Sequence, residues 1–480
     1  MTVKLPEKVK FIIETLNGAG FEAYAVGGCV RDSILGKEPK DWDITTNASP
    51  EETKALFRRT IDTGIEHGTV TIMLDKEGFE VTTYRVDGKY EDNRHPSEVL
   101  FTKSLSEDLL RRDFTINAMA YNDGQGLVDL FGGLSDLEQG IIRAVGDPMA
   151  RFKEDALRIM RAVRFASALG FEIEKETEDA MSFYAENLRD ISAERIREEL
   201  FKLIMGKHPE KIMTAVKAGI IDIVLPEFME CVDCMQENRY HNNTVAEHII
   251  DTLKFMQMTL GMNGYERDPR IKLNYEFTEK EKQILVITML FHDIGKPRVK
   301  FMEGERAHFW GHQEESAKMA VTALKRLKCD NETIRTVNAL VANHDVRFTW
   351  TWEKNGSSAR KLAHKVGENN VKLLLAVQYA DSFGQAGPYL KESLEEIEAM
   401  QTCVEEMFEK QECFSLKSLA VTGADLINEC DMKPGEELGA VLNWLLTQVI
   451  ENPALNSKEV LLQMVRDRFF NGKSENEADE

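Results

Sequence analysis

The run Gly27-Gly28-Cys29-Val30-Arg31-Asp32, continued by Leu35-Gly36 and Asp41-Trp42-Asp43, decides the fold of this chain. It directly follows a β-prone run at residues 21–26, and paired glycines after a strand let the backbone approach a phosphate closely. The helix that follows presents free N–H groups to that anion, and Arg31 adds a charged donor. Aspartates spaced by two point to one face of a strand and can share Mg²⁺ ions. The segment therefore predicts a phosphate site beside metal-binding carboxylates.

An Asp-x-Asp pair has a second interpretation, because solvated aspartates are common at strand ends. The two residues alone leave both interpretations open for Asp41 and Asp43. Glu80 stands in another β-prone run and is a third acidic residue near in sequence. An ordinary exposed strand residue explains Glu80 equally well, so we leave it outside the predicted metal set.

Two later blocks narrow the interpretation by resemblance. The glycine and aspartate segment resembles the signature of nucleotidyltransferases of the DNA polymerase β superfamily. The blocks Asp108 to Ala120 and Arg151 to Phe165 resemble motifs of class II tRNA nucleotidyltransferases and bacterial poly(A) polymerases. The resemblance covers residues 20–205 and implies an α+β fold. This fold has an N-terminal polymerase-β-like head, a mixed sheet with helices, followed by an all-α neck, an HD-containing body and a tail.

The resemblance assigns nucleobase selection to Glu154, Asp155 and Arg158. A carboxylate beside a guanidinium offers acceptors and donors that match the Watson–Crick edges of both C and A. Arg151, Asp155 and Arg158 are spaced by four and three, so we expect them on one stripe of a single helix. A helix covered with surface ion pairs is the plain structural alternative.

The resemblance also assigns the triphosphate to Arg112, Arg161 and Arg164, and implies Mg²⁺ ions at Asp41 and Asp43 that activate a 3′ hydroxyl and stabilise the leaving pyrophosphate. It places a flexible element, needed to switch from C to A addition, at the polar loop that ends in Arg94-His95-Pro96. Residues 87–106 retain this loop, which favours CCA addition to tRNA from CTP and ATP. A poly(A) polymerase or an A-only tRNA nucleotidyltransferase shares the motifs and is the first alternative.

The later half of the chain contains a second candidate site. His248, His292-Asp293 and Asp381 resemble the metal ligands of HD phosphohydrolases. Imidazole and carboxylate suit an unidentified divalent metal, Mn²⁺, Ni²⁺, Fe²⁺ or Mg²⁺, more than structural zinc. His312 and His344 are candidates for a second metal or a substrate phosphate. The set either hydrolyses phosphoesters or only braces an RNA-binding body, and a primarily hydrolytic HD enzyme is the second alternative.

Composition restricts the kinds of protein that remain possible. A net charge of −22 argues against a protein that coats nucleic acid nonspecifically. No apolar run approaches the roughly 18–20 residues of a membrane helix and the N-terminus lacks a signal pattern, so we expect a cytoplasmic protein without a membrane segment. The seven cysteines are scattered and odd in number, which favours reduced structural thiols. A noncatalytic RNA-binding protein, with idle carboxylates, is the third alternative.

The length of 480 residues predicts two to four modules, and the resemblance together with the helical periodicity divides the chain into five parts. They are a nucleotidyltransferase head (1–146), a helical neck with the nucleotide-selection helix (147–205), a helical body (206–240), an HD metal-binding domain (241–390) and a helical tail (391–480). Helices after residue 205 are expected to recognise tRNA through its shape and backbone. The oligomeric state stays open.

Overall fold

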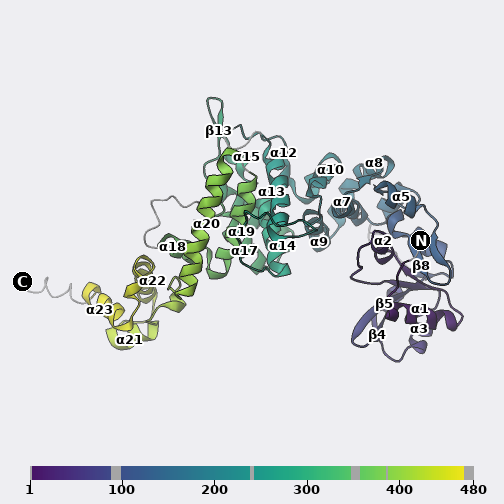
Figure 1. Ribbon diagram of the computed structural model, residues 1–480, viewed down its shortest axis with the longest axis horizontal. Helices are drawn as coiled ribbons and strands as arrows, with labels where there is room; N and C mark the ends of the chain where they lie inside the picture. Colours follow the sequence, from purple (N-terminus) through teal and green to yellow (C-terminus); the bar gives the residue numbers. More distant parts are fainter. Residues whose placement is uncertain (1–2, 88–98, 238–242, 347–356, 385–386, 470–480) are drawn as a thin grey trace, which may run out of the picture. The chain divides into compact units, whose positions relative to one another are not determined.

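The computed structural model describes residues 3–87, 99–237, 243–346, 357–384 and 387–469 (Figure 1). The chain divides into two compact units: unit one is residues 1–229 with 326–328, and unit two is residues 230–325 with 329–480. The finer division into five parts stays a prediction. The loop segment with Arg94-His95-Pro96 lies outside the described residues. Within the described part of the chain, no helix is long and apolar enough to cross a membrane.

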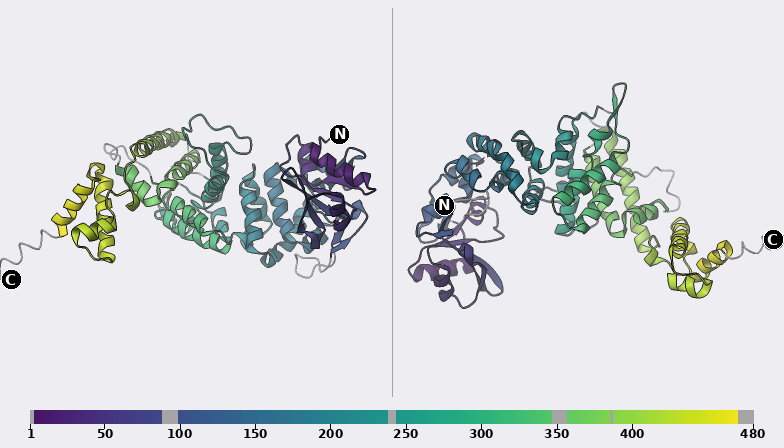
Figure 2. Two further views of the ribbon diagram at one scale, coloured as in Figure 1. Left: turned by 90° about the horizontal axis from the view of Figure 1, so that it is seen from below. Right: turned by 180° about the vertical axis from the view of Figure 1, so that it is seen from behind.

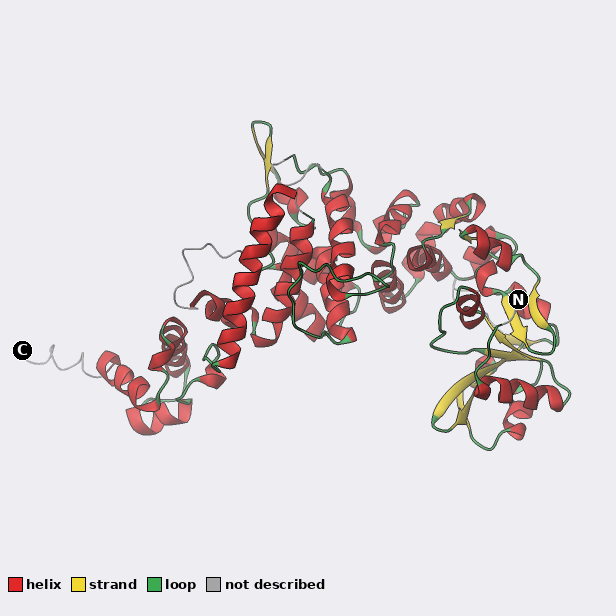
Figure 3. Ribbon diagram, viewed as in Figure 1, coloured by secondary structure: helices red, strands yellow, loops and turns green. Residues whose placement is uncertain are grey.

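A seven-stranded mixed sheet forms the start of unit one, in the order β3-β4-β5-β2-β1-β8-β9 (Figure 3). Within this sheet β2 and β5 run parallel, and every other neighbouring pair is antiparallel. The strands are β1 Ala23–Val26, β2 Ile44–Thr46, β3 Thr60–Gly64, β4 Thr69–Leu74, β5 Glu77–Thr83, β8 Met119–Asn122 and β9 Gly126–Asp129; β6 Arg85–Asp87 and β7 Val99–Phe101 form a separate hairpin. The predicted run at residues 69–74 is confirmed as β4.

The centre of the sheet is held by its own apolar residues and by α1. All four residues of β1 are buried, and Tyr24 and Val26 pack with Tyr84, Leu109 and Ala120 in one core cluster. The amphipathic helix predicted over residues 7–20 is confirmed as α1 Glu7–Gly18, whose buried face repeats at helical spacing. Burial of such side chains contributes roughly 1.5–3 kcal/mol each, and it fixes β1 and its glycine turn at the middle of the sheet.

Helices make up most of the remainder of unit one. Its helices are α2 Gly28–Ile34, α3 Pro50–Leu56, α4 Leu105–Leu110, α5 Gly133–Gln139, α6 Pro148–Glu154, α7 Leu157–Leu169, α8 Lys175–Tyr184, α9 Ala193–Ile204, α10 Ile212–Lys217, α11 Ile221–Val224 and α12 Pro226–Val232, the last reaching into unit two. Short 3₁₀ turns are η1 Ile65–His67, η2 Thr115–Asn117, η3 Ala185–Asp190 and η4 Pro209–Lys211. Helices α7 and α9 pack closely against each other.

One helix expected to be continuous is broken at Asp155. Helix α6 ends at Glu154, α7 begins at Leu157, and Asp155 between them has extended backbone angles of φ −139° and ψ 105°. The Asp155 carboxylate accepts a hydrogen bond from the Leu157 N–H at 3.0 Å. Aspartate side chains compete in this way with the helical backbone. The prediction that Arg151, Asp155 and Arg158 share a stripe of a single helix is therefore wrong.

Unit two is built on helices (Figures 1 and 2). They are α13 Val245–Leu260, α14 Glu279–Phe291, α15 Lys296–Val299, α16 His312–Arg326, α17 Asn331–Val341, α18 Ser357–Val366, α19 Glu368–Phe383, α20 Gly387–Glu409, α21 Gly423–Cys430, α22 Glu436–Glu451 and α23 Lys458–Phe469. Helix α14 packs against α13, α17 and α19. Its residues Ile284 to Phe291 are all buried, as in a helix that is apolar all round.

The α+β fold class is confirmed, with two local exceptions: strand β11 and the β12–β13 hairpin lie in the part expected to be all-helical. A two-stranded pair joins β10 Ile141–Ile142 with β11 Glu172–Ile173. A hairpin of β12 Phe301–Glu303 and β13 Arg306–His308 projects from the helices of unit two, as both views from front and back show (Figures 1 and 2).

Candidate active site

The glycine turn after β1 requires glycine at its first position. Gly27 has φ +82° and ψ −131° and precedes the first residue of α2, Gly28. This φ lies in the region that side chains disfavour. A Cβ atom at Gly27 would also lie 3.2 Å from Nη1 of Arg112. The turn therefore brings the backbone and the Arg112 guanidinium together.

The two predicted catalytic aspartates lie just before β2 and not within it. Asp41 and Asp43 are exposed, and β2 begins at Ile44. The Asp43 carbonyl still accepts a hydrogen bond from the Val26 N–H at 3.0 Å, so Asp43 is tied to the end of β1. Desolvation raises the pKa of Asp43, Arg112 opposes this shift, and Asp41 adds to it. A carboxylate next to a second carboxylate is a favourable place for a cation.

A third acidic residue, Glu80, lies on strand β5, which pairs in parallel with β2. Ile44 is the register partner of Val81. Asp43 directly precedes Ile44 and Glu80 directly precedes Val81, so continuing this parallel register would place the two residues opposite each other. Glu80 is exposed. The pairing of β2 with β5 therefore gives a reason to include Glu80 in the proposed metal set, which the sequence alone did not provide.

Three of the predicted phosphate-binding arginines gather around the ring of Phe165. The guanidinium carbon of Arg31 lies 5.1 Å from the ring centroid, that of Arg161 5.5 Å and that of Arg164 4.0 Å. Burial lowers the pKa of Arg164 to about 10, with Glu199 opposing and Arg161 adding to the shift. Three clustered positive charges favour an anion such as a triphosphate.

Buried acidic and amide side chains hold these arginines in place. Asp113 accepts two hydrogen bonds from Arg161, at 2.8 and 2.5 Å. Glu199 on α9 pairs with Arg164 at 3.0 Å. Asn117 accepts from Arg31 at 2.6 Å and donates to Asp113 at 3.1 Å. These anchoring residues were not assigned from the sequence, because their partners stand far along the chain.

Asp108 is a further anchor that sequence reasoning missed. It is fully buried and pairs with Arg111 at 2.8 Å and with Arg112 at 3.3 Å. Burial opposes its ionisation, but Arg112 and Arg111 hold the pKa of Asp108 below its usual range. The spacing of three and four residues between Asp108 and these arginines was the signal that could have found it.

The residues predicted to select the nucleobase are held by two separate sets of contacts around the helix break. Arg158 donates to the Glu154 carboxylate at 2.7 Å and to the Arg111 carbonyl at 2.9 Å. Glu154 also pairs with Arg151 at 2.5 Å. Asp155 accepts from Arg195 of α9 at 3.1 Å. Glu154 therefore holds two guanidinium groups, while Asp155, which lies between α6 and α7, is held by a residue of α9.

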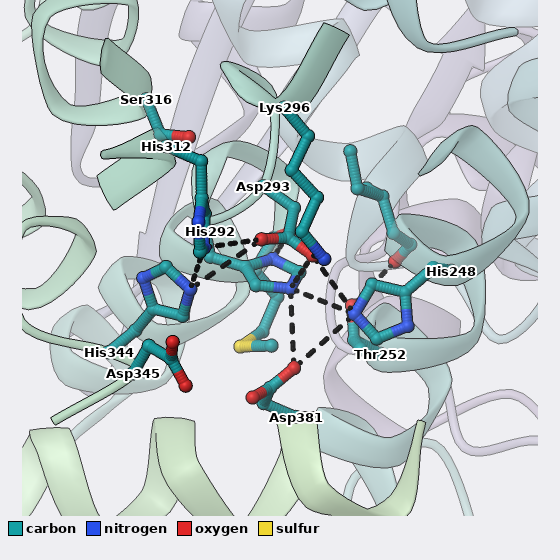
Figure 4. A network of polar contacts seen from close by, with 12 residues as sticks. His248, Thr252, His292, Asp293, Lys296, His312, Ser316, His344, Asp345 and Asp381 are labelled. Atoms are coloured by element: carbon teal, nitrogen blue, oxygen red, sulfur yellow. Dashed lines mark hydrogen bonds and ion pairs between the residues drawn. The ribbon is translucent and has the colours of Figure 1, made fainter. Parts of the chain in front are cut away.

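A second cluster lies in unit two, where α13, α14 and α19 meet (Figure 4). His248, His292 and Asp381 each offer one ligand atom, and these atoms lie within 4.8 Å of one another. The His248 and His292 Nε2 atoms are 3.3 Å apart. Burial lowers the pKa of His292, but Asp293 and Asp381 together raise it to about 10. Positive charge, as a proton or a metal ion, is strongly favoured here.

The histidines predicted as additional ligands form the second half of this cluster. His312 and His344 group with Asp293 within the same 4.8 Å limit. Their Nδ1 atoms lie 2.8 and 2.7 Å from the Phe309 and Val341 carbonyl oxygens, so both Nδ1 atoms donate. Burial lowers the pKa of His344. When both rings are neutral, each Nε2 atom carries a lone pair, and the two Nε2 atoms lie 3.3 Å apart. A cation bound between them would accept both lone pairs.

Asp293 stands between the two halves. Its Oδ2 lies 3.2 Å from His248 Nε2, and its Oδ1 lies 3.3 Å from His312 Nε2 (Figure 4). Lys296 contacts the same carboxylate at 2.6 Å and donates to Gln236. Burial opposes ionisation of Asp293, but Lys296 and His292 hold its pKa well below the usual range. The imidazole and carboxylate groups of both halves would suit divalent metal ions.

Family comparisons match separate segments of the chain. The description of the first matching family is the poly A polymerase head domain, over residues 23–143. The second is an RNA and SrmB-binding site of polymerase A, over residues 170–231. The third is tRNA nucleotidyltransferase domain 2, over residues 309–465. The first match contains the glycine turn, the aspartates and Arg112.

Individual relatives extend the likeness over nearly the whole chain. The chain is 37% identical to the CCA-adding enzyme of Levilactobacillus brevis over 469 residues, which are 96% of this chain and 99% of that protein. It is 57% identical to the CCA-adding enzyme of Lactiplantibacillus plantarum over 210 residues, which span 52% of that protein. The CCA-adding enzyme of Bacillus stearothermophilus, solved with CTP, superimposes with a TM-score of 0.67 at 27% identity, covering 99% of this chain and 100% of that one. The chain belongs to the family of CCA-adding enzymes.

Proposed function

We propose that this chain adds C, C and A to the 3′ end of tRNA from CTP and ATP. The observation that carries the proposal is the gathering of Arg31, Arg161 and Arg164 around Phe165. Asn117 links Arg31 to Asp113, and Asp113 in turn holds Arg161. Family membership supports the substrates, since the relatives are CCA-adding enzymes and one was solved with CTP.

Asp41, Asp43 and Glu80 form the proposed ligand set for Mg²⁺. All three provide the carboxylate oxygens that Mg²⁺ prefers. Bound Mg²⁺ ions would activate the tRNA 3′ hydroxyl and neutralise the leaving pyrophosphate. The protein itself orients the triphosphate through Arg112 and the arginines at Phe165. Asp155 and Arg158 present an acceptor and donors to the base, held rigid by Arg195 and Glu154.

A direct assay tests the proposal. Pure protein is incubated with tRNA lacking its 3′ end, with Mg²⁺ and CTP, ATP or both. We expect two C residues with CTP alone and a complete CCA with both nucleotides. Extension by A alone on any RNA would show a poly(A) polymerase, and A addition only to tRNA ending in CC would show an A-only enzyme.

The role of Glu80 is tested by the substitution E80Q. It is expected to lower the rate of CMP addition at least about 10-fold, since even residues that only support metal ligands account for roughly 10- to 100-fold. Raised Mg²⁺ should restore part of the rate. The matched control is E77Q on the same strand, where the exposed Glu77 pairs with Lys8. Equal single-turnover rates for both variants would exclude Glu80 from the site.

The role of Arg195 is tested by R195A and R195K. Loss of the charged contact to Asp155 should lower kcat/KM for CTP about 10- to 100-fold. R195K should recover part of it. Because Asp155 faces the base in the proposal, the preference for CTP over UTP should fall as well. R189A, which removes an exposed pair with Glu186, serves as control. An unchanged CTP preference in R195A would leave Arg195 only a structural role.

A second proposed function belongs to the cluster in unit two: hydrolysis of phosphoesters with divalent metal ions. It is supported by the facing Nε2 atoms of His312 and His344 beside the buried carboxylate of Asp293. Divalent ions held there would lower the pKa of water and polarise a phosphate. The six donors suit Mn²⁺, Ni²⁺, Fe²⁺ or Mg²⁺. Lys296, held by Asp293 and Gln236, supplies a fixed positive charge for the phosphate.

A further inference from the structure

The ring of Phe165 is a contact surface shared by three guanidinium groups. Its side chain is 8% exposed, and the fully buried Phe114 packs edge-on against it, with centroids 5.8 Å apart and an angle of 79°. The Arg164 guanidinium lies 4.0 Å from the ring centroid, and those of Arg31 and Arg161 lie at 5.1 and 5.5 Å. A cation over an aromatic face is attracted to its electrons, and the attraction grows as water is excluded. The ring therefore holds together three like charges that repel each other.

The ring and the neighbouring carboxylates hold different parts of each guanidinium group. Each of the three has an acidic partner: Arg31 pairs with Asp32 at 2.8 Å, Arg161 with Asp113 at 2.5 Å and Arg164 with Glu199 at 3.0 Å. A carboxylate takes up N–H donors, whereas an aromatic ring contacts only the flat face and leaves the donors at the edge available. Within the described part of the chain, Nη1 of Arg161 and both Nη atoms of Arg164 make no hydrogen bond. These donors can bind phosphate oxygens while the contacts that orient the side chains persist.

We propose that Phe165 is a positioning residue for the triphosphate of the incoming nucleotide. Its ring fixes the planes of the three guanidinium groups through their flat faces. The cluster lies beside the glycine turn, since a Cβ atom at Gly28 would be 3.7 Å from Nη2 of Arg31. The inference rests on the nucleotide transfer proposed above and adds a residue to it. Because the attraction depends on the electrons of the ring and not on its volume, an aliphatic side chain of similar size cannot replace Phe165.

The kinetic test changes the electrons of the ring and keeps its shape. Phe165 is replaced by mono-, di- and trifluorophenylalanine, which withdraw progressively more charge from the ring face. KM for CTP in CMP addition to tRNA lacking its 3′ end should rise stepwise, by about 10- to 100-fold for the trifluoro ring, with a smaller change in kcat. F165L should show a similar loss, and F165Y should keep most of the affinity. The control is the trifluoro replacement at Phe201 of α9, which is 5% exposed and has no cation over its ring within the described residues.

Binding measurements separate this role from base stacking and from the proposed transfer. Calorimetry is carried out with Mg²⁺ and either inorganic tripolyphosphate or cytidine. We expect fluorination of Phe165 to weaken tripolyphosphate binding stepwise and to leave cytidine binding unchanged. Loss of cytidine binding alone would show that the ring stacks on the base and would overturn the proposal, as would equal tripolyphosphate affinities across the series or the same loss at Phe201. If tRNA is not extended by any form of the protein, the transfer function fails, whereas a graded loss of tripolyphosphate binding still supports the role of Phe165.

Discussion

D41A is expected to lower the single-turnover rate of CMP addition to tRNA lacking its 3′ end by at least about 10³-fold, because the site loses a metal-binding carboxylate beside Asp43. Asp41 is exposed before β2, so the fold does not depend on its side chain. The rate is measured with labelled CTP and saturating Mg²⁺, and a circular dichroism spectrum confirms folding.

The matched control for D41A is D62A on strand β3. Asp62 is a partly exposed aspartate of the same sheet and pairs with Lys54, a contact that contributes at most about 1 kcal/mol. D62A should add CMP at the unmodified rate. Hydrolysis at the Asp293 cluster should persist in D41A, because the two sites use separate residues. Parallel loss of both activities, or a loss of transfer below tenfold, would contradict this assignment.

D293N is expected to have the largest effect in unit two. Asparagine keeps the size of the buried side chain and can still accept from Lys296, but it removes the charge shared by the two halves of the cluster. Mn²⁺ affinity should fall at least about 100-fold, since even residues that only support metal ligands account for 10- to 100-fold. Phosphoester hydrolysis should fall at least about 10³-fold. Titration calorimetry and phosphate release measure the two effects.

D345N is the control for D293N. Asp345 lies close by, next to His344, but it is exposed and accepts from Gln313 (Figure 4). D345N should bind Mn²⁺ and hydrolyse substrate like the unmodified chain. CMP addition should be unchanged in both variants. If D293N binds Mn²⁺ normally, the cluster is a structural brace of the RNA-binding body, and the hydrolytic function is wrong.

Local sequence determined the elements and the chemistry of single segments. The periodicity of residues 7–20 predicts α1, and the β-prone run at 69–74 predicts β4, because side-chain spacing alone encodes these elements. Gly27 was recognisable as a turn residue because paired glycines follow a β-prone run, and the structure gives it a positive φ. The spaced histidines and aspartates of the later half indicated a metal site, and the structure brings His248, His292 and Asp381 together.

Tertiary structure decided which of these residues meet. Arg31 of α2 and Arg164 of α7 share the ring of Phe165, a contact that no local period encodes. The helix breaks at Asp155, whose side chain accepts hydrogen bonds from the Leu157 N–H and from Arg195 of α9. These two contacts replace the backbone hydrogen bonds that a continuous helix would form there. Asp293 was predicted as one ligand among four, but only packing of the unit-two helices places it between two sets of histidines. Sequence spacing encodes contacts within an element, whereas the sites are made of contacts between elements distant along the chain.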